Sequence, residues 1–378
     1  MFHLTEAALE CLHKIVKLNK DNPTKSMEES SNKGTCINRV FIVGNGFDLD
    51  CGLDTTYDTF CKTHFCDSNT ADYTSSEMYK FLKEKFVIAT EGKNWFSLED
   101  EMRNYIIQHN SEFQSSFKSD RYYFNELIKA IRIHIQIFAY TTKCMERTEY
   151  VQTNVANADL VKNPVQIHIR KDSVAYEVLK SIVRNPLYFT QIISFNYTNI
   201  QNVLNCVVGE IVGFNESQLN KRKDLLPHVQ YIHCNFDSNC AVLGIEQRIF
   251  ANDGQEVVIP QSYNFLKKCN QFSPSERQRA IDTVMTADEL VIFGHSLGQA
   301  DADYFKPLFE DMFANKPSHE RKITFITYND NREILKHVKY YAGGNNIVPH
   351  HSFKDLSFIY TSVEESRITY SNLLNGIS

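Results

Sequence analysis

Short apolar runs alternate with longer amphipathic stretches along most of this chain. The apolar runs, which are typical of buried strands, lie at about residues 40–43, 189–194, 229–232, 241–245, 290–293 and 323–327. Apolar residues at helical spacing fall between several of these runs, at about residues 275–287, 301–315 and 331–340. Strands that alternate with helices predict a mostly parallel sheet with helices on both faces.

A mainly helical pattern separates the first predicted strand from the second. Its clearest apolar stripe consists of Phe124, Leu127, Ile128, Ile131, Ile135 and Phe138. Residues three and four apart share one face of a helix, so this stripe indicates a helix that faces a core. We therefore predict a Rossmann-like α/β fold with a large helical insertion. The expected domains are an N-terminal helix and polar linker (1–37), a nucleotide-binding domain (38–75 and 185–378) and the helical insertion (76–184).

Composition narrows the class of protein. The formal charge of −6 argues against a dedicated nucleic-acid-binding protein, which usually has a basic surface. No apolar run approaches the roughly 20 residues that span a bilayer, and the first residues lack a signal-peptide pattern, so we expect a cytoplasmic protein. The ten cysteines include no Cys-x-x-Cys pair. We therefore expect reduced thiols and no metal site.

The first predicted strand runs directly into a glycine turn, Gly44 to Gly46, which Asp48 follows. Glycine has no Cβ, so the backbone there can come close to a bound phosphate or ribose. A strand, a glycine turn and a helix open many nucleotide-binding domains. The dinucleotide fingerprint would have a third glycine where this chain has Leu49. Thr55 and Asp58 have the spacing of a capping box, so we expect a helix to begin there.

Polar or glycine residues follow each predicted strand. Because ligands bind beyond the carboxyl ends of parallel strands, we expect these residues to meet at one edge of the sheet. The candidate site residues are Gly44, Asn45, Gly46, Asp48, Asn196, His233, Gly294, Ser296 and Asp301. The alternative is that strand ends are polar because loops are polar.

Four of these side chains could take part in chemistry. The amide of Asn196 can hold a ribose hydroxyl or a water molecule, but asparagine also favours turns and helix caps. Imidazole exchanges protons near neutral pH, so His233 is a candidate general base, although a single histidine at a strand end is often structural. Asp48 and Asp301 would each fix a ribose hydroxyl, orient a catalytic group or cap a helix.

A competing hypothesis comes from Gly294-His295-Ser296-Leu297-Gly298, which matches the nucleophile elbow of serine hydrolases. The remaining members of a triad, in the required chain order, would be Asp330 and then His337, His350 or His351. The glycine turn after the first strand has no role in that scheme, and the helix after the elbow is delayed. The serine-hydrolase alternative stays open.

Several motifs together carry a family resemblance. They are Phe41 to Leu49 with Gly52, Leu53 and Tyr57, then Trp95 with Leu98 and Glu99, Ser194 to Thr198, Ile232 with His233, and Phe293 to Gly298 with Asp301. In this order they resemble the AbiH family of bacterial abortive-infection proteins, which act in phage defence. Leu49 belongs to that family's own motif, so it need not count as a missing glycine.

The order of elements is also similar, more remotely, to sirtuin-like NAD-consuming domains of other defence systems. In those domains a glycine turn cradles the nucleotide, and an asparagine and a later histidine perform the chemistry. Asn196 and His233 have this order and separation. Glycine usually follows that histidine, whereas this chain has Cys234, whose side chain could narrow the pocket.

The resemblance implies an antiphage protein that cleaves the nicotinamide–ribose bond of NAD⁺, with NAD as the substrate. Asn196 and His233 would be catalytic, and the other seven candidate residues would bind the nucleotide, with the backbone N–H groups of Gly44, Asn45 and Gly46 on its phosphates. A non-catalytic nucleotide-binding sensor is a second alternative. The expected partners are NAD or a related nucleotide, a phage-derived trigger and a second copy of the chain, without a membrane or a dedicated nucleic-acid partner.

Overall fold

The computed structural model describes residues 37–53, 55–67, 73–92, 96–109, 116–140, 169–184, 189–212, 226–233, 242–251, 254–271, 273–314, 317–318, 320–343 and 356–363. The chain divides into two compact units, Met1–Ile37 and Asn38–Ser378. The predicted N-terminal helix and linker lie outside the described residues, except for Ile37. Trp95, Cys234, His350 and His351 also lie outside them.

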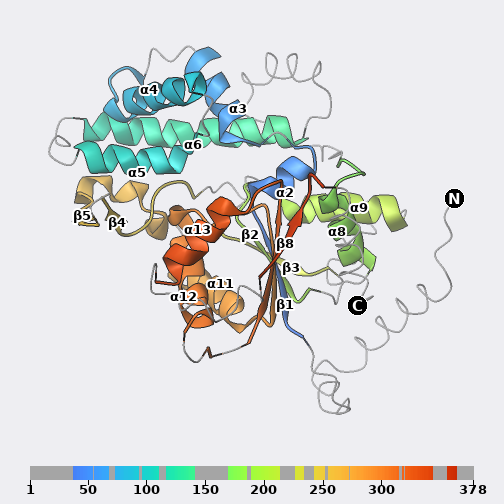
Figure 1. Ribbon diagram of the computed structural model, residues 1–378. Helices are drawn as coiled ribbons and strands as arrows, with labels where there is room; N and C mark the ends of the chain where they lie inside the picture. The colour runs from blue at the N-terminus through green and yellow to red at the C-terminus, as the bar shows by residue number, and fades with distance from the viewer. Residues whose placement is uncertain are drawn as a thin grey trace. The chain divides into compact units, whose positions relative to one another are not determined.

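A six-stranded parallel sheet forms the centre of the second unit (Figure 1). Its strands are β1 (Arg39–Val43), β2 (Gln191–Ser194), β3 (His228–Tyr231), β6 (Glu289–Phe293), β7 (Lys322–Thr327) and β8 (Leu356–Tyr360). They lie in the order β3-β2-β1-β6-β7-β8, and each neighbouring pair is parallel. This order is that of the doubly wound Rossmann fold, so the predicted fold class is confirmed. The direction of winding reverses between β1 and β6, where such sheets bind ligands.

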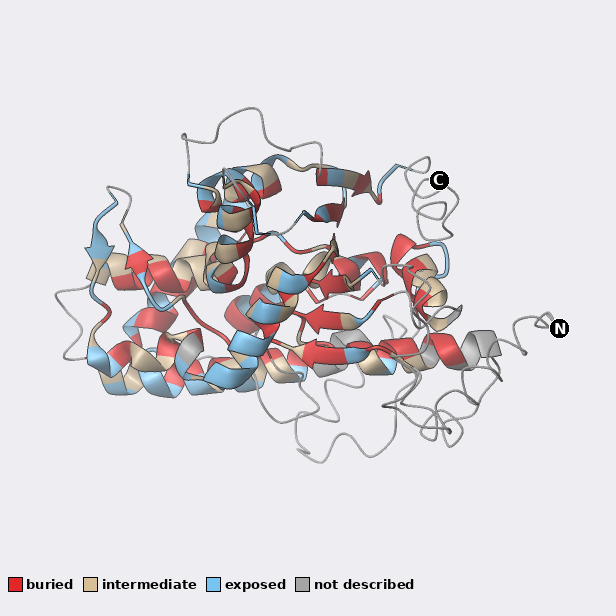
Figure 2. Ribbon diagram, turned by 90° about the horizontal axis from the view of Figure 1, so that it is seen from below, coloured by how far each residue is buried: buried red, intermediate tan, exposed pale blue. Residues whose placement is uncertain are grey.

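Helices cover both faces of the sheet, as the alternating pattern predicted (Figure 1). On one face lie α8 (Val174–Arg184) and α9 (Ile200–Val212), and on the other lie α11 (Pro274–Thr286), α12 (Ala302–Met312) and α13 (Arg332–Tyr341). In β1, Phe41 and Val43 pack toward the first group, whereas Val40 and Ile42 pack toward the second. Both faces of the strands are therefore buried (Figure 2), which explains their uninterrupted apolar runs.

A second group of helices lies on the side of the carboxyl ends of the strands (Figure 1). This helical layer consists of α3 (Tyr57–Cys61), a π-helical turn (Lys62–Asp67), α4 (Glu77–Glu91), α5 (Leu98–His109) and α6 (Phe117–Tyr140). It shares a hydrophobic core with the hairpin β4 (Ile249–Phe250) and β5 (Glu256–Val257) and with a 3-10 helix, Gln261–Leu266. The predicted stripe on α6 is buried in this core, as Leu127 and Ile131 show.

Several local expectations were wrong. Residues 242–245 form no strand; Ile245 makes only an isolated bridge to Lys267. A short helix, α2 (Asn45–Asp50), begins inside the glycine turn itself, and α3 begins with Thr56 as its N-cap rather than Thr55. Helix α8, which the sequence pattern assigned to the insertion, packs on the sheet. The domain division remains a prediction. Among the described helices, none is long and apolar enough to cross a membrane.

A buried carboxylate ties the helical layer together. Asp120 on α6 is fully buried, and its Oδ1 accepts hydrogen bonds from the Ser76 hydroxyl at 2.7 Å and the Met78 N–H at 3.1 Å. Its Oδ2 accepts from the hydroxyls of Tyr105, at 2.7 Å, and Tyr263, at 2.6 Å. One side chain on α6 thus joins α4, α5 and the 3-10 helix Gln261–Leu266.

Replacing Asp120 with alanine should lower the free energy of unfolding by about 4 kcal/mol, because four buried donors would lose their acceptor. Urea unfolding would measure the change. Lys129→Ala is the matched control, since Lys129 is exposed on the same helix and should change stability by less than about 0.5 kcal/mol. Equal stability of the two variants would contradict the role of Asp120.

Candidate functional site

Two glycine turns meet where the sheet reverses its winding. The Gly44 N–H donates to the Phe293 carbonyl at 2.8 Å, and the Gly46 N–H donates to the Gly294 carbonyl at 2.9 Å. A Cβ on Gly44 would lie 2.6 Å from the His295 Cα, and one on Gly294 would lie 2.3 Å from the Phe47 nitrogen. Gly294 also has a φ of +65°, which L-residues rarely adopt. The turns therefore require glycine because their backbones pack directly against each other.

This packing corrects one expectation from the sequence. The N–H groups of Gly44 and Gly46 already donate to backbone carbonyls of the β6 turn, so they are not available to a phosphate. The two glycines shape the site by close approach rather than by offering donors.

A cavity of about 650 Å³ opens at this point. All nine candidate residues named from the sequence line it, although they come from four separate loops. The helical layer supplies the opposite wall, which includes Tyr57, Phe60, Glu99, Ile131 and Ile135. The structure thus brings the candidate residues together; their individual roles remain predictions.

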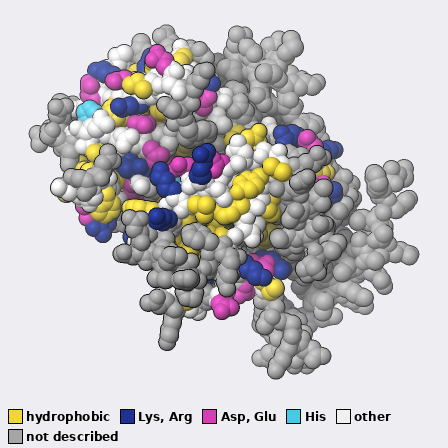
Figure 3. Space-filling model, in the orientation of Figure 1, with side chains coloured by type: hydrophobic (Ala, Val, Ile, Leu, Met, Phe, Trp, Pro, Cys, Tyr) yellow, Lys and Arg dark blue, Asp and Glu magenta, His cyan; other side chains and the backbone are white. Residues whose placement is uncertain are grey.

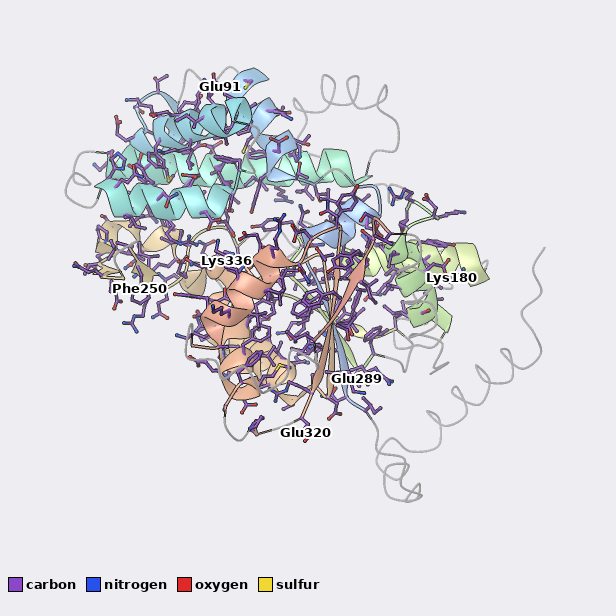
Figure 4. All side chains as sticks on the ribbon, in the orientation of Figure 1. Glu91, Lys180, Phe250, Glu289, Glu320 and Lys336 are labelled. Atoms are coloured by element: carbon purple, nitrogen blue, oxygen red, sulfur yellow. The ribbon has the colours of Figure 1, made fainter. Side chains whose placement is uncertain are left out.

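Helix α13 contributes to the mouth of the cavity through Lys336, which Figure 4 labels. Lys336 pairs with Glu333 at 3.2 Å, and Arg103, also at the cavity, pairs with Asp100 at 2.9 Å. Basic and acidic side chains are interspersed over the face drawn in Figure 3. The mouth is therefore not a continuous basic surface.

Asp48 lies at the floor of the cavity and is only 1% exposed. Its carboxyl group contacts the Asn196 amide nitrogen at 2.9 Å, the Thr198 hydroxyl at 2.9 Å and the Thr55 hydroxyl at 3.3 Å. Burial raises the pKa of Asp48 to about 7, although the contacts with Thr198, Asn196 and Thr55 oppose that rise. Thr55 is available for this contact because Thr56, not Thr55, caps α3.

The contact with Asp48 also fixes the orientation of Asn196. Its Nδ2 donates to the carboxyl group, so its Oδ1 is the atom left for another partner. Asn196 is 4% exposed and lines the cavity, and its Oδ1 accepts no hydrogen bond within the described part of the chain. A buried acceptor without a donor is costly, so this atom is suited to a ligand or water hydroxyl.

A second carboxylate, Asp301, is at the centre of an ionic cluster. Its Oδ1 lies 2.9 Å from His233 Nε2 and 3.0 Å from Lys268 Nζ, and its Oδ2 lies 3.4 Å from His295 Nε2. Burial alone would raise the pKa of Asp301, but Lys268 and His233 outweigh it and hold that pKa well below its usual range. Lys268 also pairs with Glu99 of α5 at 2.9 Å, so the cluster reaches the helical layer.

These charges determine which ring nitrogens carry protons. Lys268 Nζ and ionised Asp301 both approach His233 Nε2, at 3.2 Å and 2.9 Å, and the shorter contact favours a hydrogen on Nε2, which leaves the lone pair on Nδ1. His295 Nδ1 accepts from the Leu297 N–H at 2.9 Å, so its Nε2–H faces Asp301. Burial lowers the pKa of His295, which keeps this ring neutral.

The sequence pattern missed several members of this cluster. Lys268 begins a short 3-10 helix, Lys268–Asn270, and directly follows Lys267, a pattern typical of an exposed basic pair. Yet it is only 8% exposed. Glu99 appeared only inside a longer motif, as did Thr198, which contacts Asp48 rather than Asp301. No local signal distinguishes these residues, because their partners are distant in the chain.

The described contacts do not assemble a serine-hydrolase triad. His337 Nδ1 donates to the Ser296 backbone carbonyl at 2.9 Å, and Asp330 accepts from the Arg332 backbone and side chain. In a nucleophile elbow the serine itself sits on the strained turn, whereas here the positive φ values belong to Gly294 and Leu297.

The strand order and the cavity at its reversal define a Rossmann-like α/β protein with a cavity at the switch point, where such folds bind ligands. A family model, bacteriophage abortive infection AbiH, matches residues 40–326, so the chain belongs to this family and the predicted resemblance is confirmed. Membership gives the chain a role in abortive-infection defence against phage.

Comparison with solved structures gives a more remote similarity. One is a structure of SIR2 in complex with the inhibitor EX-527, 2′-O-acetyl-ADP-ribose and a deacetylated p53 peptide. The match is 11% identical, covers 90% of this chain and 95% of that chain, and has a TM-score of 0.30. No curated protein matches this chain.

Replacing Gly294 with alanine should lower the free energy of unfolding by about 3 kcal/mol or more, because the backbone penalty at positive φ adds to an overlap with Phe47. Gly254→Ala separates the two effects, since Gly254 has a φ of +82° and nothing within 4 Å of the added Cβ. That control should lose only about 1 kcal/mol. Similar losses in urea unfolding for both variants would show that the turns are not tightly packed.

The raised pKa of Asp48 predicts that the free energy of unfolding depends on pH. A carboxyl group whose folded pKa is raised stabilises the fold only while it is protonated, so its contribution is lost as pH rises from 3.8 toward about 7. Relative to Asp48→Asn, the wild type should lose about 2 to 3 kcal/mol of stability between about pH 5 and about pH 8. Asp282→Asn, an exposed carboxylate on α11, should show no such difference from wild type. Urea unfolding at both pH values tests this, and parallel pH profiles for wild type and Asp48→Asn would refute it.

Proposed function

We propose that this phage-defence protein is an NAD⁺ glycohydrolase, which cleaves the bond between nicotinamide and ribose. One observation carries the proposal. The unpartnered Asn196 Oδ1 and the His233–Asp301 pair line a single cavity at the switch point of a Rossmann-like sheet. Family membership supports the defence role, and the cavity supports the chemistry.

The proposed reaction begins with departure of nicotinamide, which takes both electrons of the C1′–N bond. Nicotinamide is a good leaving group, so the enzyme mainly has to position the ribose and stabilise the cationic carbon that remains. Asn196 Oδ1 would accept a hydrogen bond from a ribose hydroxyl or from the attacking water.

His233 would act on that water as a general base. Its Nδ1 carries the lone pair and would take the proton as the new C1′–O bond forms, giving ADP-ribose. The resulting imidazolium would be stabilised by the Asp301 carboxylate, which also fixes the ring orientation. Both carboxylate oxygens of Asp301 already contact cationic or N–H groups. We therefore assign Asp301 the orienting role.

The activity test is incubation of purified protein with NAD⁺, with and without extract from phage-infected cells, followed by chromatography of nicotinamide and ADP-ribose. Asn196→Ala and His233→Ala should each lower the rate by at least about 100-fold. Lys180→Ala is the control, because Lys180 lies on α8 outside the cavity wall and should keep the wild-type rate (Figure 4).

No nicotinamide release under any of these conditions would remove the enzymatic proposal, and full activity of both alanine variants would refute the site. Labelling of Ser296 by a fluorophosphonate would favour the serine-hydrolase alternative. Nucleotide binding without turnover would favour the sensor. In cells, NAD⁺ should fall on infection with wild type but not with Asn196→Ala.

A further inference from the structure

Asp48 is a buried carboxyl group without a cationic partner. The side chains that contact it, Asn196, Thr198 and Thr55, are all neutral. Within the described ranges, no lysine, arginine or histidine forms an ion pair with it. Asp301, the other carboxylate of the cavity, differs because Lys268 and two histidines surround it.

The hydrogen bonds that Asp48 accepts offset its burial only in part. Thr55 has one hydroxyl hydrogen, and its 2.6 Å contact with Asn45 Oδ1, an acceptor, takes that hydrogen. Little of it is left for the longer 3.3 Å contact with Asp48 Oδ2, so Thr55 contributes least of the three contacts to stabilising an ionised carboxylate. Burial therefore dominates and raises the pKa of Asp48 to about 7.

The surroundings do not supply a compensating positive charge. The nearby titratable groups include Cys51, the C-cap of α2, and Tyr57 and Tyr197 of the cavity wall, and burial raises the pKa of all three, so they are neutral at pH 7. Asp50 of α2 and Arg170 also lie near Cys51, and these two charged groups pair with each other at 3.6 Å. Across the cavity, Lys268 is shared between two carboxylates, Asp301 and Glu99.

The cavity thus offers a carboxyl group and an unpartnered acceptor oxygen to its occupant. It also offers aromatic walls at Tyr57, Phe60 and Tyr197, which suit a flat ring. A cationic ring would match the carboxyl group and the aromatic walls, since it would favour ionised Asp48 and be attracted by the aromatic faces, while Asn196 Oδ1 stays available to a hydroxyl.

Resting on the proposed function, we propose that Asp48 recognises the positive charge of the oxidised pyridinium ring, so that the cavity selects NAD⁺ over NADH. The two dinucleotides differ little in size, so apolar contacts alone cannot separate them. The pyridinium carries a positive charge that the reduced ring lacks. Binding of the cation favours ionised Asp48, so a proton leaves the protein when the ligand binds near or below neutral pH.

The test is isothermal titration calorimetry with carba-NAD⁺, a pyridinium dinucleotide that cannot be cleaved, and with NADH. Wild type should bind carba-NAD⁺ at least about tenfold more tightly than NADH at about pH 8, and this preference should fall about tenfold by about pH 6. At pH 7, buffers of different ionisation enthalpy should report release of about half a proton.

Asp48→Asn is nearly isosteric and keeps an oxygen for Asn196 and Thr198, so the fold is retained, as thermal unfolding would verify. It should bind the two dinucleotides with similar affinity at every pH and release no proton. Asp282→Asn, exposed on α11, should behave as wild type.

Equal affinity of the wild type for the two dinucleotides, or a preference that survives in Asp48→Asn, would overturn this inference. A preference that depends on Asp48 without any nicotinamide release would refute the proposed hydrolase but leave charge recognition standing. Cleavage of NAD⁺ with no such preference would support the proposed hydrolase and refute charge recognition by Asp48. If neither dinucleotide binds, both the hydrolase and the charge recognition are refuted.

Discussion

The direct contact between the two glycine turns, Gly44 to Gly46 and Gly294, is the constraint on which the other features depend. These turns follow β1 and β6, the two strands between which the sheet reverses its winding. Because their backbones touch, the chain on either side is held at a fixed separation. Asp48 then projects from one side of the junction and Asp301 from the other. A single added methyl group at any of these glycines would push the two sides apart.

One cavity consequently holds two buried carboxyl groups, of which one is ionised and the other is protonated below about pH 7. Asp301 is surrounded by N–H donors and a lysine, so it stays ionised. Asp48 is surrounded by neutral groups, so it holds a proton until pH approaches 7. Pairs of acids whose surroundings separate their pKa values in this way are common in sites that carry out acid–base chemistry. The difference arises from position alone, since the residue type is the same.

Much of this arrangement follows from the sequence. The apolar runs located five of the six strands of the parallel sheet, and the rule for parallel strands placed Asn196, His233 and Asp301 at one edge. Contacts between distant segments were not predictable. Nothing near Lys268 indicates that two carboxylates lie around it, and nothing near Gly46 indicates that its N–H is already used. Thr55 was misassigned for a related reason: Thr56, its neighbour, can cap the same helix equally well.

The lysine shared by Glu99 and Asp301 has a consequence for building hybrid proteins. Glu99 belongs to α5, whereas Asp301 follows β6, so one ionic chain runs through both the helical layer and the sheet. A chimera that grafts foreign helices onto this sheet would leave Lys268 with a single carboxylate beside His233, unless the graft brings an acid to the same place. The helical layer is therefore not an exchangeable module. A working hybrid has to take Glu99, Lys268 and Asp301 from the same parent protein.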